Sequence, residues 1–264
     1  MSRGLLDSSE LMRISREIPE LNDFHKMVCG LSPDFISITF AKDSNIPLAL
    51  VCLQNAVNTY KEAHYAMHEV FAHRMWYLEK KKPRNDDAAT FFGLFYVDDA
   101  ALRLYSAGEH LANGIIMMLE INDKDLEPYK KKGDRERVSQ QSIVGRFLRK
   151  QKADHPVTKA VSKLVDSKEW CATINYRNRW VHEQPPTVKG LGIVYKRGRR
   201  WKDSPTGKEH MLCISGEGDT PEYSIDTLIG FTQHALFQFS DTLTSVIKFY
   251  VGLLRCSGFE FDES

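Results

Sequence analysis

The sequence predicts an all-α protein, a helical bundle with a four-helix core into which a small β-hairpin is inserted around residues 190–216. Two patterns predict this architecture. Apolar residues recur at spacings of three and four along several long segments, which is the period of helices packed lengthwise in a bundle. Short apolar stretches flank a polar loop within 190–216, as expected for two paired strands. The 264 residues can bury a substantial core, and we expect one domain over residues 1–264.

The first half of the bundle follows about 45 residues for which we find no role, although part of 8–28 is expected to be helical. A long helix is predicted over 50–78, and the basic residues 80–82 that close it suit the helix dipole. A second helix covers roughly 86–121 and starts at the capping residue Asn85. Its apolar repeat contains Phe91, Phe92, Phe95, Leu102, Tyr105, Ile116 and Met117.

The second half begins with a polar, charged stretch, 122–138, which is predicted to be an exposed connection. A short helix is expected over 139–150, and one long helix from 157 to about 182. The last helix covers 225–253, with Ser224 to cap its start. Apolar positions repeat along its whole length, so this helix is expected to pack lengthwise in the bundle.

The most informative polar residues lie at the end of the helix predicted from 157. The segment reads Arg177-Asn178-x3-His182, and Pro185 and Pro186 follow it, where no helix can continue. His182 is therefore expected in the last turn or just beyond it, where unpaired carbonyl groups favour the imidazolium form. A histidine that titrates near neutral pH can donate or accept a proton in a reaction.

The pattern Arg177-Asn178-x3-His182 in an all-helical chain resembles the Arg-x4-6-His motif of HEPN domains. These domains are helical bundles, and many bacterial members are metal-independent ribonucleases. The resemblance implies that Arg177 holds the scissile phosphate of RNA, that His182 is the general acid or base, and that Asn178 orients one of them. The 2′-hydroxyl of the RNA would attack the neighbouring phosphorus, leaving a 2′,3′-cyclic phosphate and a 5′-hydroxyl.

The same resemblance implies RNA as a partner, no cofactor, and a homodimer in which two motif helices face each other across a composite cleft. It also suggests a toxin or defence effector with an antitoxin protein. In members that pair with a nucleotidyltransferase antitoxin, a tyrosine lies two residues after the histidine. This chain has Gln184 there, which argues against that kind of antitoxin.

Spacing alone does not single out this motif, because Arg103 to His110 and Arg149 to His155 satisfy the same pattern. Asn178 and the helix end distinguish the third match, and Arg103 has an expected ion-pair partner in Asp99. Within one helix, the arginine and histidine of the motif lie roughly 140° apart around the axis. Either a long arginine reaches around the helix end, or a symmetry-related helix supplies the opposing group.

A polar cluster, Glu109, His110 and Asn113, interrupts the apolar repeat of the helix over 86–121. These residues are candidates to line a cleft. The alternative is a hydrogen-bond network between helices in which each polar group has a partner.

Basic residues Lys196, Arg197, Arg199 and Arg200 beside Trp201 form a second candidate, for RNA binding by phosphate contact and stacking. The alternative is a solvated loop.

A metal site is not predicted. His64, His68, Glu69 and His73 lack the His-Glu-x-x-His spacing of zinc proteases, so packing histidines are favoured over ligands.

Composition excludes several other classes. The formal net charge of +1 argues against a protein that coats nucleic acid. Local basic patches can still bind a phosphate backbone. The five cysteines are scattered without a Cys-x-x-Cys pair, which favours reduced thiols in the cytoplasm. No apolar run approaches the roughly 18 residues of a membrane span, and the acidic residues among the apolar ones near the N-terminus lead us to expect no secretory signal. We expect a cytoplasmic protein with no membrane partner.

The sequence leaves three functional hypotheses. The preferred one is a metal-independent endoribonuclease of HEPN type. The second is a non-catalytic HEPN-like helical module that binds a nucleotide, RNA or a protein partner. The third is a plain bundle in which Arg177 and His182 merely cap a helix.

Overall fold

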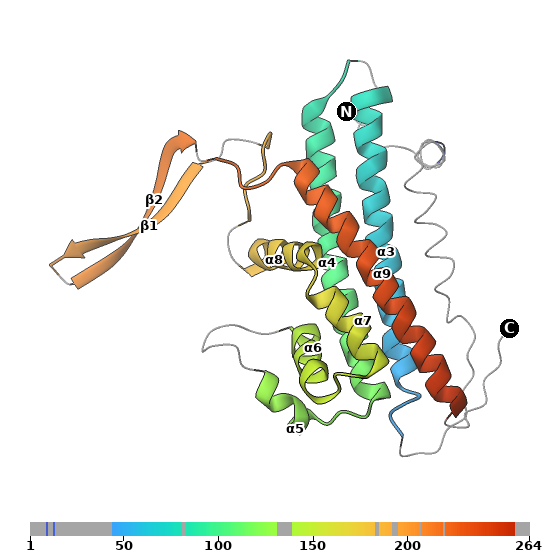
Figure 1. Cartoon of the computed structure of the whole chain (residues 1–264). Helices are drawn as coiled ribbons and strands as arrows, with labels where there is room; N and C mark the ends of the chain where they lie inside the picture. The colour runs from blue at the N-terminus through green and yellow to red at the C-terminus, as the bar shows by residue number, and fades with distance from the viewer. Residues whose placement is uncertain are drawn as a thin grey trace.

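The computed structural model describes residues 44–80, 83–130, 139–182, 185–191, 195–205, 207–218 and 220–256, together with Ser9 and Arg13. This part of the chain is mostly helical, as predicted (Figure 1). Its elements are α3 (Ala49–Met75), the π-helical turn η1 (Trp76–Lys80), α4 (Asp86–Met118), α5 (Asp123–Leu126), the 3-10 turn η2 (Glu127–Tyr129), α6 (Gln140–Gln151), α7 (Pro156–Val165), α8 (Lys168–His182), β1 (Tyr195–Ser204), β2 (Gly207–Gly218) and α9 (Ile225–Cys256). The helix expected within 8–28 lies outside the described residues apart from Ser9 and Arg13.

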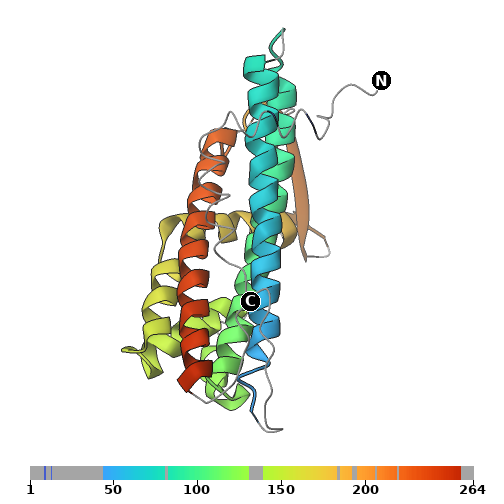
Figure 2. The ribbon, with the colours of Figure 1, turned by 90° about the vertical axis from the view of Figure 1, so that its right-hand side faces the viewer.

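Three long helices, α3, α4 and α9, run along one another and form the body of the bundle (Figure 1). Figure 2 shows α3 and α9 lengthwise beside each other. Nearly all repeat positions of α9, from Ile225 to Tyr250, are buried, which confirms that this helix packs lengthwise in the bundle. The predicted caps are also present, because Asn85 Oδ1 accepts from Ala88 N at 2.9 Å and Ser224 Oγ accepts from Thr227 N at 3.1 Å.

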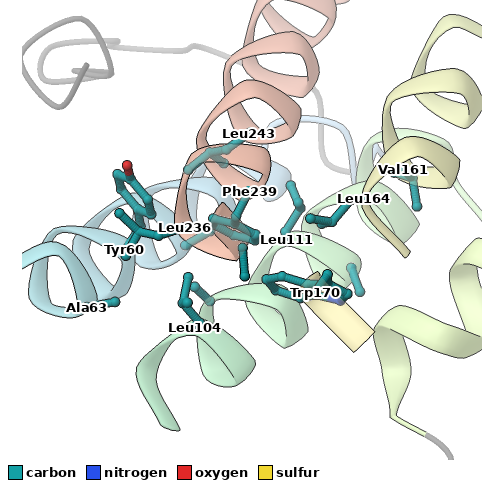
Figure 3. Packing of buried hydrophobic residues seen from close by; sticks show 14 of the residues in the cluster. Tyr60, Ala63, Leu104, Leu111, Val161, Leu164, Trp170, Leu236, Phe239 and Leu243 are labelled. Atoms are coloured by element: carbon teal, nitrogen blue, oxygen red, sulfur yellow. The ribbon is translucent and has the colours of Figure 1, made fainter. Parts of the chain in front are cut away.

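The central layer of the core joins α3, α4, α8 and α9 (Figure 3). The ring of Phe239 on α9 stacks on Tyr60 of α3, with 5.8 Å between the centroids, and on Trp170 of α8 at 5.5 Å. Leu104 of α4 is fully buried beside them. Burial of aromatic side chains of this size makes a large contribution to core stability.

The prediction for the buried face of α4 is wrong. Phe91 and Phe95 are 55% and 59% exposed. None of the other predicted apolar positions of α4 is fully buried. The buried face combines large apolar residues (Val97, Leu104, Leu111, Ile115 and Met118) with many small ones: Ala89, Gly93, Ala100, Ala101, Ala107, Gly108, Ala112 and Gly114. They let α4 approach its neighbours so closely that a Cβ atom at Gly114 would lie 3.0 Å from Leu53 Cδ2.

The single helix predicted from 157 to 182 is in fact two helices, α7 and α8, separated at Asp166–Ser167. Ser167 Oγ accepts a hydrogen bond from Trp170 N at 3.0 Å, which caps the first turn of α8. The break redirects the chain so that α8 runs across the bundle and packs against both α4 and α9 (Figure 1). The predicted connection 122–138 likewise contains short helical turns, α5 and η2.

Strands β1 and β2 lie in the segment for which the hairpin was predicted and pair antiparallel, from Tyr195↔Gly218 to Ser204↔Gly207. Backbone hydrogen bonds close the base of this ribbon: Lys189 N donates to Tyr223 O at 2.9 Å, and Glu222 N donates to Thr187 O at 3.0 Å. Among the described residues, no helix has the length and apolar character that a bilayer crossing needs.

Candidate functional site

The motif helix α8 is attached to α4 by a buried side chain next to the motif. The hydroxyl of Tyr176 donates to Asp98 Oδ1 at 2.5 Å. The tyrosine ring is buried and lies edge-on to Tyr223, with the centroids 5.7 Å apart. Burial raises the pKa of Asp98 to about 6, and the hydrogen bond from Tyr176 opposes this shift. This contact fixes the next residue, Arg177, over α4.

The three motif side chains converge at the end of α8. Arg177 Nη1 donates to Asn178 Oδ1 at 3.0 Å and lies 3.4 Å from Nε2 of the exposed His182. The second contact is a hydrogen bond when Nε2 carries no proton, because a guanidinium group has no acceptor. The long arginine side chain thus spans the angle between the two helix positions within one chain, the first of the two arrangements expected from the sequence.

The guanidinium of Arg177 lies over an aromatic ring from α4. Its Cζ atom is 3.8 Å from the centroid of Tyr105, a close cation–π contact. Burial raises the pKa of Tyr105, the charge of Glu109 raises it further, and Arg177 opposes both effects. Tyr105 therefore interacts electrostatically with the guanidinium group of Arg177.

Arg177 carries a positive charge without an ion-pair partner in the described part of the chain. No carboxylate there lies within ion-pair distance of it, and its Nε atom is buried without a hydrogen-bond partner. Arg179, two residues later, differs in this respect. Its Nη2 atom donates to Glu222 Oε1 at 3.0 Å, and a second bond joins Nη1 to the other carboxylate oxygen. Of these two arginines, Arg177 is the one with charge available for an anion.

In the competing pair, Arg103 and His110, the arginine has a structural role. Arg103 Nε donates to Asp99 Oδ2 at 2.9 Å, as predicted, and Nη1 pairs with Glu62 of α3. No hydrogen bond joins this arginine to His110 in the described structure. Its charge is compensated by two carboxylates.

The third pair, Arg149 and His155, is also structural. Arg149 Nη1 donates to Asp166 Oδ1 at 2.8 Å, which links the end of α6 to the end of α7. His155 Nδ1 accepts from Val157 N at 3.3 Å and caps the start of α7. The structure therefore distinguishes three matches to the same motif, since only the pair on α8 brings its arginine to its histidine among the described residues.

Of the candidates Glu109, His110 and Asn113, Glu109 is the one whose contacts the structure describes. Glu109 Oε2 accepts from Gln140 N at 3.0 Å and Oε1 accepts from Gln141 N at 3.2 Å, so this carboxylate caps α6. His110 is half-buried and Asn113 is exposed. Glu109 therefore matches the alternative interpretation, in which the polar group has hydrogen-bond partners on another helix.

The basic residues Lys196, Arg197, Arg199, Arg200 and Trp201 lie on β1, and their side chains are outside the described part of the structure. Their predicted contact with RNA stays a prediction. Gln184 is also outside the described residues.

The histidines of α3 pack among aromatic rings. His73 stacks on Phe92 with 4.7 Å between centroids and on Tyr96 with 5.2 Å, and burial lowers its pKa. His64, His68 and Glu69 are also buried. No group of histidine, cysteine and acidic side chains in the described residues has an arrangement that could hold a metal ion.

Two features of the site were not predicted from the sequence. They are the position of the Tyr105 ring under Arg177 and the hydrogen bond between Asp98 and Tyr176. Tyr105 was assigned to an apolar repeat, and Asp98 had no role. One signal was available, because Asp98, Tyr105 and Glu109 share one face of α4 at spacings of seven and four. The contact of that face with α8 depends on the break at Ser167.

Comparisons with known proteins were made at three levels. No protein-family model matches the chain, and neither a curated protein nor a solved structure matches it. Function is therefore inferred from the geometry around Arg177 and His182 and from the motif they form.

Proposed function

We propose that the protein is a metal-independent endoribonuclease of HEPN type, with Arg177, Asn178 and His182 as its reactive groups. One observation carries the proposal. An arginine without a carboxylate partner in the described structure lies 3.4 Å from the ring nitrogen of a histidine at an exposed helix end. A phosphodiester needs a cation for its charged oxygens and a nearby group that moves protons.

In this mechanism, Arg177 donates hydrogen bonds to the oxygens of the scissile phosphate and stabilises the charge that develops on them. The 2′-oxygen forms a bond to phosphorus as the bond from phosphorus to the 5′-oxygen breaks. His182 takes the proton of the 2′-hydroxyl as base or supplies one to the leaving 5′-oxygen as acid. Asn178 holds the guanidinium through its Oδ1 atom at 3.0 Å. The products are a 2′,3′-cyclic phosphate and a 5′-hydroxyl.

The finer architecture belongs to the same proposal. We assign α3, α4, α8 and α9 to the four-helix core of a HEPN-like domain, with the ribbon of β1 and β2 as an insertion. The motif also implies a homodimer with facing α8 helices, RNA as partner, and a role as a toxin or defence effector controlled by an antitoxin. The basic residues of β1 would then extend the RNA contact.

The proposal predicts that His182→Ala abolishes RNA cleavage. Purified protein is expected to cut single-stranded RNA in EDTA, and the variant is expected to be about 10²–10⁴-fold slower, the usual contribution of a general acid or base. His234→Ala, which removes another exposed histidine, on α9, is the matched control and should keep full activity. Cleavage products are resolved on a denaturing gel.

Equal cleavage by the wild type and His182→Ala would refute the assignment. RNA binding without cleavage, retained in His182→Ala and lost in Arg177→Ala, would indicate the non-catalytic HEPN-like module instead. A lower melting temperature in both variants, with no effect of RNA, would indicate a plain helix cap.

A further inference from the structure

We propose that Tyr105 is a positioning residue, whose ring holds the guanidinium of Arg177 where it can bind a phosphate beside His182. The role in cleavage rests on the proposed function, while the placement of Arg177 does not. The direct observation is the 3.8 Å distance from Arg177 Cζ to the centroid of the Tyr105 ring.

A platform is needed because of the geometry of α8. Arg177 and His182 lie roughly 140° apart around the helix axis, so holding the guanidinium beside the histidine costs the long side chain conformational freedom. The ring comes from another helix, α4, and restricts the guanidinium to the orientation in which Nη1 is 3.4 Å from His182 Nε2. Planar stacking on an aromatic face is favourable for arginine.

Consecutive residues of α8 contact the same face of α4. Tyr176 bonds to Asp98, and Arg177 lies over Tyr105, which follows Asp98 by two helical turns. Because Tyr176 is buried, this pair of contacts fixes both the position and the rotation of α8 at the motif. The platform is therefore part of the packing between two helices rather than a chance contact of a surface side chain.

Hydrogen bonds hold only one end of the guanidinium. Nη1 donates to Asn178, whereas Nε is buried and has no partner in the described structure. Glu109, one turn after Tyr105, makes no ion pair with the arginine in the described structure, and its two oxygens accept from the backbone of Gln140 and Gln141. The ring can thus orient Arg177 without consuming the charge that a phosphate requires.

The test compares Tyr105→Phe, which keeps the ring, with Tyr105→Leu, which removes it. Binding of a DNA oligonucleotide, which lacks the 2′-hydroxyl and cannot be cleaved by this route, is measured by fluorescence anisotropy. Tyr105→Leu should weaken binding roughly threefold to thirtyfold, the range of a cation–π contact, and Tyr105→Phe should stay within about twofold of the wild type. Tyr65→Leu, at an exposed tyrosine of α3, is the matched control.

A double-mutant cycle separates positioning from a general loss of structure. In an Arg177→Gln background, where no cation lies over the ring, Tyr105→Leu should change binding by less than about twofold. The same loss in both backgrounds, or wild-type binding by Tyr105→Leu, would overturn the proposal.

A second readout does not depend on ribonuclease activity. The NMR signal of the Arg177 Nε–H group should show a ring-current shift in the wild type and in Tyr105→Phe, and this shift should disappear in Tyr105→Leu. A signal that is identical in all three proteins would refute the platform. If the platform signal is present but the wild type cuts no RNA in EDTA, the proposed function fails and the placement of Arg177 stands.

Discussion

At the scale of single residues, the half-buried carboxyl of Asp98 links the contact between α8 and α4 to pH. Its pKa is raised from the ordinary value of 3.8 to about 6 by burial, so the folded protein favours the protonated carboxyl. A folded-state pKa above the unfolded value stabilises the fold fully below about pH 3.8, and this stabilisation is lost as the pH rises through about 6. At neutral pH, an ionised Asp98 is retained at some cost in stability.

Asp98→Asn should remove this dependence on pH. Asparagine keeps an oxygen that can accept from Tyr176 but cannot ionise, so the variant should gain stability relative to the wild type as the pH rises from 4 to 7. Urea unfolding of both proteins across that range measures the difference in the free energy of unfolding. Asp154→Asn, at an exposed position, is the control and should follow the wild type. A constant difference between Asp98→Asn and the wild type would contradict the account.

At the scale of residues, the sequence predicts the reactive side chains of the candidate site but not the residues that position them. Arg177, Asn178 and His182 could be selected from their motif and the prolines that follow. Tyr105 could not, because an aromatic residue in an apolar repeat has the same pattern whether it packs in the core or carries a cation. The difference depends on which helix crosses α4 at that point.

At the scale of elements, the position of α8 depends on the break before it. Uniform apolar periodicity from 157 to 182 predicts one helix, but Ser167 provides a side-chain cap that starts a new one. Its hydroxyl also donates to Gln238 of α9, which fixes the corner to the bundle. Periodicity alone does not distinguish a cap inside a repeat from a polar residue on the outer face of a continuous helix.

Ser167→Ala should lower the free energy of unfolding by about 0.5–2 kcal/mol, the usual cost of losing an N-cap. Ser245→Ala is the matched control, because that exposed serine of α9 donates to Asp241 O in the preceding turn and has no other hydrogen bond within the described part of the chain. Its replacement should have no measurable cost, since alanine is a better helix former. Chemical denaturation of the three proteins gives the comparison. Equal stability of Ser167→Ala and Ser245→Ala would show that this hydroxyl does not define the corner.

The buried faces of helices with a regular repeat of large apolar residues were predictable from the sequence. The buried face of α4, which contains many alanine and glycine residues, was not. The repeats of α3 and α9 place large apolar residues inside, as their patterns predict. In α4, alanine and glycine make up much of the buried face and allow neighbouring helices to approach closely, with large apolar residues such as Leu104 and Leu111 between them. Side-chain size therefore misleads at Phe91 and Phe95, which are predicted to be buried and are exposed.

At the scale of the whole molecule, the bundle brings α8 across α4 and leaves its last turn accessible. The all-helical class follows from periodicity, whereas the crossing depends on long-range packing that periodicity does not contain. Three arginine–histidine pairs satisfy the same motif in the sequence, and the fold gives two of the arginines carboxylate partners. The third remains beside its histidine with its charge available to an anion.

The chemistry of the cleaved ends tests this account most directly. RNA of defined sequence is incubated in EDTA with the wild type, Arg177→Ala and His182→Ala, and the product ends are identified by mass spectrometry. The account predicts 2′,3′-cyclic phosphate and 5′-hydroxyl ends from the wild type and no cleavage above background from either variant. Equal cleavage by the variants, or products with 3′-hydroxyl and 5′-phosphate ends, would contradict it.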